Sequence, residues 1–175
     1  MEHLEKKAVI SPISKTGEGT ERFHVMALTD IDGKRNGTSY YWYYSASKNE
    51  NTEIVTSEGF ETGKDNTRTM IEKWNNKAYG EQNASFAPKF LDVWGAIQEE
   101  VGKGWYVPSK EEWSAFGDRL NIDEINYKEK NLSEFYWTSS QVSEKNVWAE
   151  SFMSGFMASN IISIHYSYIR LGTTF

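Results

Sequence analysis

The fold is decided by a C-terminal stretch that opens with Phe135-Tyr136-Trp137-Thr138-Ser139-Ser140. The stretch continues through Val147-Trp148-Ala149-Glu150-Ser151-Phe152, turns near Gly155, and closes with Tyr168-Ile169-Arg170-Leu171-Gly172-Thr173-Thr174-Phe175. Short runs of aromatic and β-branched residues, separated by Ser, Asn and Gly, favour a meander of short strands over a helix. The last third of the chain is therefore predicted to form a sheet.

Within this stretch, the segment from Met153 to Tyr168 does not sort into an apolar and a polar face. A strand whose register is fixed by burial should carry apolar side chains on one pleated face. Tyr, Ser, Asn, His and Met side chains combine adaptable hydrogen bonding with broad contact area, which is typical of binding loops. We therefore expect this segment to be a binding surface. From Ser163 onward, one alternate set is Ser163, His165, Ser167 and Ile169, and the other is Ile164, Tyr166, Tyr168 and Arg170.

The length of 175 residues predicts one domain, or one domain with an appendage, that is large enough to bury a core. The sequence has no apolar run of about 18 residues, so no membrane span is predicted. The first seven residues are charged and lack the apolar centre of a signal peptide. The expected location is cytoplasmic or virion-associated, unless a leader has been removed.

The net charge is −6 and the basic residues are scattered, which argues against nucleic acid as a partner because phosphate neutralisation needs clustered cations. The absence of cysteine excludes disulfides, thiolate metal sites and cysteine nucleophiles. Aromatic residues make up 15% of the chain. Since such side chains bury large areas, we expect an aromatic core beneath many loops.

The N-terminal part predicts short strands. The first twenty residues are expected to be loosely ordered or to form an edge strand around Ala8 to Ile13. Another short strand is predicted at Glu53 to Thr56. The apolar alternation from Arg22 to Thr29 and the aromatic run from Tyr40 to Tyr44 predict two strands. The turn dipeptides Asp32-Gly33 and Asn36-Gly37 lie between them, so the two strands are predicted to form a hairpin. Asp30 and Asp32 lack the further acidic ligands of a calcium loop, which favours a plain turn.

The middle of the chain predicts helices. One starts near Asp65 to Thr67, carries Met70, Ile71 and Trp74 at helical spacing, and ends at Asn75-Asn76. A second is predicted from about Lys89 to Val101. A third follows Ser109, whose spacing to Glu112 is that of a capping box, and ends near Asn121. The order of hairpin, helices and meander predicts an α+β fold with two to three helices, a small antiparallel sheet and many loops.

The order and spacing of several short motifs then resemble a known family. Gly104-Trp105-Tyr106-Val107-Pro108-Ser109 precedes the capped helix, followed by Tyr136-Trp137-Thr138-Ser139-Ser140, Trp148, Phe152, Gly155 and Tyr168-Ile169-Arg170-Leu171. This combination resembles the C-type-lectin-like fold in the branch shared with formylglycine-generating enzymes. Within that branch it is most similar to the variable proteins of diversity-generating retroelements, which occur in phages and gut bacteria. The match covers roughly 65–175.

The resemblance implies an aromatic and glycine scaffold that displays a diversified ligand-binding surface. It also implies a lectin-like domain over 61–175 with a candidate variable region at 142–168, while 1–60 would be a β-hairpin segment packed on that domain or part of it. The implied scaffold comprises Gly104, Trp105, Pro108, Trp113, Trp137, Ser139, Trp148, Phe152, Gly155 and Arg170. The implied ligand-binding positions comprise Glu144, Asn146, Glu150, Met153, Phe156, Ser159, Asn160, Ile162, Ser163, His165, Tyr166 and Ser167.

Catalytic alternatives find little support in the residues. A serine nucleophile at Ser139 or Ser140 would need a base, yet the three histidines occur in no recognisable pairing and no Gly-x-Ser-x-Gly pattern is present. Formylglycine-generating chemistry in the related enzymes depends on cysteines, which this chain lacks. His165 has no accompanying cluster of metal donors. The carboxylates are expected at helix surfaces and helix starts, where solvation or the helix dipole accounts for them: Glu99, Glu100, Glu111, Glu112, Asp118, Asp123 and Glu124.

The sequence therefore predicts a binding protein without catalysis, cofactor or metal. Its partner would be a protein or cell-surface ligand held by the C-terminal variable surface, and an oligomer is compatible with the sequence. Two alternatives stay open: a structural or adhesive module of a phage or cell-surface assembly without a diversified site, and a carbohydrate-active enzyme that uses a carboxylate pair.

Overall fold

The computed structural model describes residues 8–13, 22–35, 37–43, 53–76, 92–153, 156–162 and 166–175, with only the backbone described for 8–13, 22 and 156–162. The fold is α+β, as predicted, with small antiparallel sheets around short helices. The described helices are α2 (Gly63–Asn75), α3 (Val93–Ala96), α4 (Gln98–Gly102) and α5 (Lys110–Arg119). The strands are β1 (Ala8–Ile13), β2 (Arg22–Ala27), β3 (Tyr40–Tyr41), β4 (Phe135–Gln141), β5 (Asn146–Ser151), β6 (Phe156–Ile162), β7 (Tyr166–Ser167) and β8 (Gly172–Thr174).

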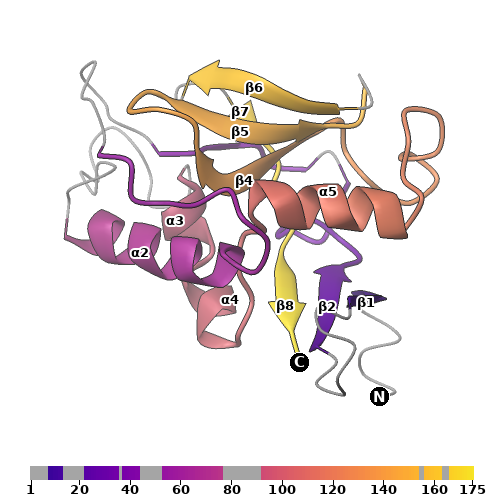
Figure 1. The fold of residues 1–175 in the computed structure, drawn as a ribbon, viewed down its shortest axis with the longest axis horizontal. Coiled ribbons are helices and arrows are strands. Elements are labelled where there is room, and N and C mark those ends of the chain that lie inside the picture. Colours follow the sequence, from indigo (N-terminus) through magenta and orange to yellow (C-terminus); the bar gives the residue numbers. More distant parts are fainter. Residues whose placement is uncertain are drawn as a thin grey trace.

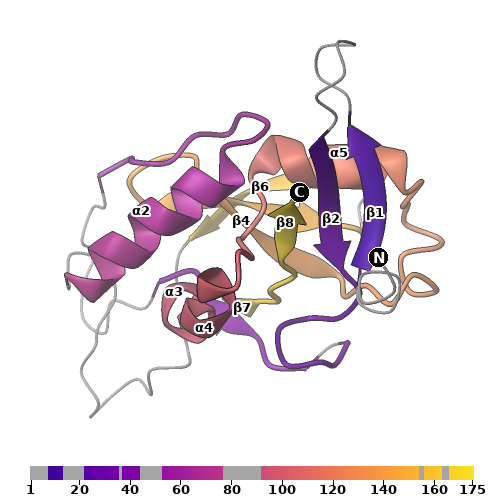
Figure 2. The same cartoon turned by 90° about the horizontal axis from the view of Figure 1, so that it is seen from below.

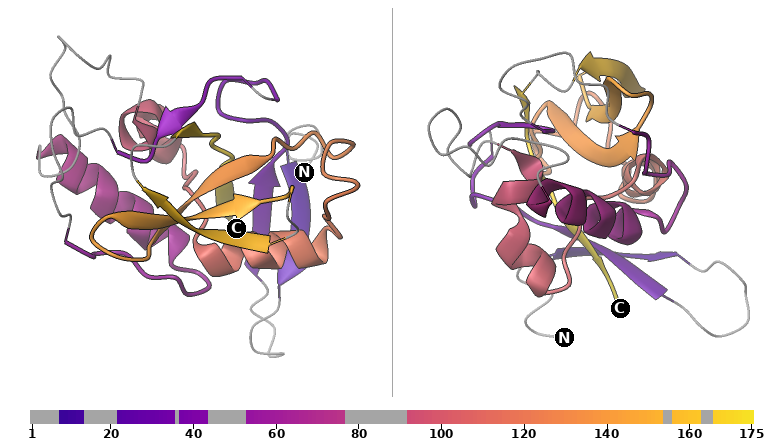
Figure 3. Two further views of the ribbon diagram at one scale, coloured as in Figure 1. Left: turned by 90° about the horizontal axis from the view of Figure 1, so that it is seen from above. Right: turned by 90° about the vertical axis from the view of Figure 1, so that its left-hand side faces the viewer.

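The described strands form three sheets. The predicted C-terminal meander is confirmed in β4–β5–β6, whose neighbours pair antiparallel. It lies on the opposite side of the molecule from β1, β2 and β8, with α5 between them (Figure 1). Seen from above, this sheet faces the viewer (Figure 3). The edge strand predicted at Ala8 to Ile13 is also confirmed, and pairs antiparallel with β2.

The hairpin predicted between Arg22–Thr29 and Tyr40–Tyr44 is wrong. β2 pairs instead with β1 on one side and with β8 on the other (Figure 2), while β3 pairs with β7. The turn at Gly33 does form, with φ of 76°, and the Asp32 carboxylate accepts the backbone N–H groups of Lys34 and Thr38. This turn redirects the chain into a second sheet, because both strands find partners in the C-terminal segment.

The strand predicted at Glu53 to Thr56 is also absent, for a local reason. This segment runs beside the end of β4, but side chains replace the backbone ladder there. The N–H of Val55 donates to Gln141 Oε1 at 3.0 Å, and the N–H of Gln141 donates to Thr56 Oγ1 at 2.8 Å. The Gln141 amide thus takes the place of a peptide group of a regular strand.

Helix α2 begins at Gly63, close to the predicted start, and ends at the predicted Asn75. The predicted capping box of α5 is confirmed: the N–H of Glu112 donates to Ser109 Oγ, and the N–H of Ser109 donates to Glu112 Oε2 at 2.7 Å. The continuous helix predicted from Lys89 to Val101 is wrong, since α3 and α4 are separate and residues before 92 lie outside the described part. The chain departs from helical geometry at the fully buried Ile97, where ψ is 1°, so core packing overrides helix periodicity.

The core is aromatic, as the composition predicts. One cluster contains Trp42, Trp94 and Trp137, and a second contains Trp113 and Tyr136. Three of these indoles donate to backbone carbonyls: Trp42 to Thr138 at 2.8 Å, Trp137 to Tyr40 at 2.7 Å, and Trp113 to Trp137 at 3.2 Å. These bonds join β3 and α5 to β4.

Candidate functional site

The candidate ligand surface is defined as residues 142–167, which contain β5, β6, β7 and the turn before β5. Figure 1 shows these strands on the side of the molecule that lies away from β1, β2 and the end of β8. β5 is the central strand of its sheet, between β4 and β6. β7 pairs with β3, and the chain after it runs beside β4, where the N–H of Trp137 donates to the Tyr168 carbonyl at 3.0 Å. The backbone of the described parts of this surface is therefore fixed by neighbouring strands.

The turn that opens the candidate ligand surface is ordered by its own hydrogen bonds. The N–H of Val142 donates to the carbonyl of Asn146 at 2.8 Å, and the N–H of Asn146 donates to Ser143 Oγ at 3.1 Å. Glu144 is exposed and Asn146 is half-buried at this turn. Both predicted contact residues can therefore reach a ligand from a defined backbone.

Two large apolar side chains of the candidate ligand surface are exposed. Met153 follows β5 and Tyr166 begins the β7 pairing, and 54% of each residue's surface is exposed. Tyr166 packs against Tyr41, with ring centroids 4.0 Å apart and planes inclined by 38°. The packing against Tyr41 limits the rotamers of Tyr166, so this exposed ring is held in place before any ligand binds.

Other predicted contact residues are placed differently. Ser167 and Glu150 are buried, with 1% and 7% exposed, which corrects the expectation that both lie at the surface. Each sits on a strand that is paired with its neighbours. The side chains of Phe156, Ser159, Asn160 and Ile162 lie outside the described residues, although their backbone forms β6. Ser163, His165 and the scaffold residue Gly155 lie outside the described residues altogether.

Within the candidate ligand surface, Glu150 is a buried carboxyl group with a shifted pKa. Burial, followed by the negative charge of Asp118, raises the pKa of Glu150 from 4.5 to about 7. On β5, Glu150 is paired with Tyr136 on one side and Met157 on the other. The strands of the candidate ligand surface therefore bury the carboxyl group of Glu150, whose pKa lies near neutral pH.

The implied scaffold residues that the structure describes differ in burial and in position. Trp113, Trp137 and Phe152 are buried, as is Pro108. Trp105 is half-buried, and Gly104 adopts a φ of 92° that favours glycine. Ser139 is fully buried, where its hydroxyl accepts a hydrogen bond from Asn66 at 3.2 Å.

Trp148 is held in place by charged neighbours. It is half-buried on β5, and its indole N–H donates to Glu58 Oε1 at 2.7 Å. Lys110 Nζ lies 3.9 Å from the centroid of the indole and 2.7 Å from Glu58 Oε2. These hydrogen bonds lower the pKa of Glu58. The contacts with Glu58 and Lys110 fix the orientation of the Trp148 indole on β5.

Arg170 anchors the chain behind the candidate ligand surface. It is 1% exposed, and its guanidinium donates to Asp30 Oδ1 at 2.8 Å, to the Ala27 carbonyl at 3.0 Å and to the Asn131 carbonyl at 2.6 Å. The Tyr136 hydroxyl donates to the same Asp30 oxygen at 2.7 Å. Burial raises the pKa of Tyr136 to about 12, opposed by the Arg170 charge. The sequence gives no signal for Asp30 as the partner, because 140 residues separate it from Arg170.

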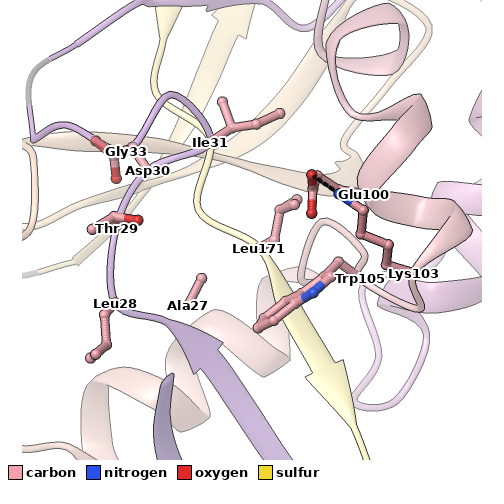
Figure 4. Close-up of a pocket in the computed structure, with 10 residues that line it drawn as sticks. All are labelled: Ala27, Leu28, Thr29, Asp30, Ile31, Gly33, Glu100, Lys103, Trp105 and Leu171. Atoms are coloured by element: carbon pink, nitrogen blue, oxygen red, sulfur yellow. Dashed lines mark hydrogen bonds and ion pairs between the residues drawn. The ribbon is translucent and has the colours of Figure 1, made fainter. Parts of the chain in front are cut away.

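A cavity of about 460 Å³ lies beside this anchor, and Figure 4 shows the residues that line it. Leu28 and Ile31 come from the segment after β2, while Trp105 and Leu171 form the opposite wall. Its charged lining groups are already paired: Lys103 with Glu100 at 2.9 Å, and Asp30 with Arg170. The cavity therefore offers mainly apolar contact.

The described residues contain no group of three or more His, Asp or Glu side chains that could hold a metal ion. In the same described part of the chain, no helix has the length and apolarity needed to cross a bilayer. A scan of protein-family models and a search of curated proteins both return no match.

Proposed function

We propose that this protein binds a protein or cell-surface ligand through the candidate ligand surface, without catalysis. The observation that carries the proposal is the pair of exposed apolar side chains, Met153 and Tyr166, on a backbone fixed by a buried aromatic scaffold. Side chains of this kind act as anchors in protein interfaces, where most of the binding energy comes from a few residues. Rigid support lowers the entropy lost on binding.

The finer form of the proposal follows from the resemblance. The fold would be C-type-lectin-like, and the surface would be diversified as in the variable proteins of diversity-generating retroelements. The contrast between the tightly bonded positions and the exposed positions supports this form. Trp137, Trp148 and Arg170 are each held by hydrogen bonds that a substitution would break, whereas Glu144, Met153 and Tyr166 are exposed. Exposed positions tolerate replacement because few contacts depend on them.

A cell-binding assay tests the binding surface. Fluorescently labelled protein is incubated with a panel of intact bacterial strains and measured by flow cytometry. Met153→Ala with Tyr166→Ala should reduce the affinity for any labelled strain at least about tenfold, since each lost anchor is worth roughly 1–2 kcal/mol. Ile125→Ala is the matched control, because Ile125 is 81% exposed and lies outside the surface. Equal binding by the double variant and the wild-type protein would refute the proposal.

Sequencing separates the diversified form from a structural or adhesive module. The gene is sequenced from many sibling cells or phages, and substitutions are mapped by position. The diversified form requires that substitutions concentrate between Val142 and Ser167 and spare Trp137 and Arg170. An even spread of substitutions, or a surface that never varies, would favour the structural module.

A further inference from the structure

A second cavity, of about 300 Å³, lies near the starts of α2, α5 and β2 and the end of β8. Figure 2 shows these four elements converging on the face that lies away from the β4–β5–β6 sheet. The cavity is thus separate from the candidate ligand surface. It concentrates titratable side chains from distant parts of the sequence, and its lining residues are His24, Glu61, Lys64, Tyr106, Glu112, Thr174 and Phe175.

The inner wall of this cavity is buried and polar. His24, Tyr106 and Glu112 are only 1%, 2% and 2% exposed. The Tyr106 hydroxyl lies 2.9 Å from Thr174 Oγ1 and 3.4 Å from His24 Nδ1. Burial raises the pKa of Glu112 to about 7, against hydrogen bonds from Ser109, Tyr106 and Gly63 that lower it. Glu112 lies at the start of α5, as expected, but it is a buried acceptor and not a solvated side chain.

Glu112 is also fixed in position. It belongs to the capping box of α5, and a Cβ atom on Gly63 would collide with its Oε2. The close approach of the start of α2 explains why glycine occupies position 63. The inner wall is therefore preformed, since neither the carboxylate nor the helix start can shift without breaking the cap.

The outer wall carries charges of both signs on neighbouring positions. Glu61 is one-quarter exposed and its Oε1 lies 3.8 Å from His24 Nε2. Its φ of 65° is unusual for a residue other than glycine. Lys64 is exposed, and it takes part in none of the ion pairs found among the described residues. Phe175, 60% exposed, adds an apolar ring to the same rim.

We propose that this cavity binds a small zwitterion of the free amino acid class. The ammonium group would lie by the Glu61 carboxylate and the inner polar wall, and the carboxylate would pair with Lys64. The aromatic rim at Phe175 would contact the side chain of the ligand. A cavity of this size, with a few convergent polar groups and an apolar rim, fits a small ligand better than a macromolecule. A ligand with one ammonium and one carboxylate group can pair with Glu61 and Lys64 at the same time, whereas an ion of one sign would meet repulsion from one of them.

Titration of the full-length protein followed by NMR tests the site. The probes are glycine, alanine and glutamate, with methylammonium and acetate as the two half-molecules. At least one amino acid should shift the signals of His24 and Thr174 at millimolar concentration, and each half-molecule should bind about tenfold or more weakly. Glu61→Gln and Lys64→Gln should each weaken amino acid binding about tenfold. Glu124→Gln and Lys130→Gln, in the exposed loop between α5 and β4, are the matched controls.

Three results would overturn the proposal. The first is the absence of shifts at the cavity up to about 10 mM of every amino acid tested. The second is binding of methylammonium or acetate as tight as that of the amino acids. The third is equal binding by Glu61→Gln or Lys64→Gln and by the two controls. Thermal unfolding of each variant verifies that it is folded. The result of the NMR titration does not affect the cell-binding assay, because that assay tests Met153 and Tyr166.

Discussion

Glu150 places a carboxyl group in an environment that disfavours its charge. Its folded-state pKa of about 7 lies above the ordinary 4.5, because of burial and the neighbouring Asp118. A raised carboxyl pKa means that the folded protein holds a proton which the unfolded chain has already lost. The contribution of Glu150 to stability is therefore full below about pH 4.5 and is lost as the pH rises to about 7.

Replacing this carboxyl group by an amide should remove the free-energy cost of ionising a buried group. Glu150→Gln is expected to raise the free energy of unfolding at pH 8 by up to about 3 kcal/mol, since one pKa unit is worth about 1.4 kcal/mol. The difference should vanish near pH 4.5. Urea unfolding at both pH values measures it.

The exposed Glu144→Gln is the control and should change neither value by more than about 0.5 kcal/mol. Some pH dependence should persist in Glu150→Gln, because the pKa of Glu112 is raised in the same direction. A variant that is equally or less stable than the wild type at pH 8 would contradict the assignment of Glu150 as a strained group.

At the scale of the element, Ser109 joins helix α5 to the loop before α2. Its hydroxyl accepts the N–H of Glu112 at 3.2 Å and donates to the Gly59 carbonyl at 2.8 Å. Ser109→Ala removes both bonds and leaves the buried N–H of Glu112 without its acceptor, while the Gly59 carbonyl keeps the hydrogen bond from Thr62 Oγ1 at 2.6 Å. The expected loss is about 1–3 kcal/mol in the free energy of unfolding, measured by urea titration.

Ser114→Ala provides the matched control for this cap, because Ser114 is exposed on the same helix. It should be neutral or slightly stabilising, since alanine has the higher helix propensity. If Ser109→Ala costs no more than Ser114→Ala, the capping box does not stabilise α5.

Elements that depend on neighbouring residues can be predicted from the sequence, whereas elements that depend on tertiary contacts cannot. The cap of α5 depends on residues three positions apart, so the local pattern was sufficient. The break at Ile97 depends on tertiary packing, and the partner of β2 depends on a strand about 150 residues away, so neither has a local signal. The Gln141 side chain replaces a strand pairing that the pattern at Glu53 to Thr56 predicted.

At the scale of the whole molecule, the sequence predicted the exposure of some contact positions correctly and of others wrongly. The exposure of Met153, Tyr166 and Glu144 agrees with their predicted role, but Glu150 and Ser167 are buried. Alternation along a strand does not reveal which face a helix covers. The second cavity had no sequence signal, because His24, Glu61 and Glu112 come together only through the convergence of four elements.

The N-terminal segment contributes interior parts of the fold. Val25, Trp42 and Asp30 are each no more than 3% exposed, and β2 pairs with β8. Without them, the guanidinium of Arg170 would lose its counter-ion and Trp137 its acceptor on Tyr40. An unpaired buried charge costs about 3–5 kcal/mol, and the loss of a core tryptophan costs about as much.

We therefore predict that residues 61–175 do not fold alone. The two losses sum to roughly 6–10 kcal/mol, which is comparable with the roughly 5–15 kcal/mol that stabilises a typical domain. The isolated fragment should lack a near-UV circular dichroism signal and a cooperative urea transition. Adding a peptide of residues 1–60 at high concentration should restore both, because the missing strand, counter-ion and indole then return in trans. A fragment that unfolds cooperatively on its own, at the urea midpoint of the full chain, would show instead that 61–175 is an independent domain and that the N-terminal segment is an attachment to it.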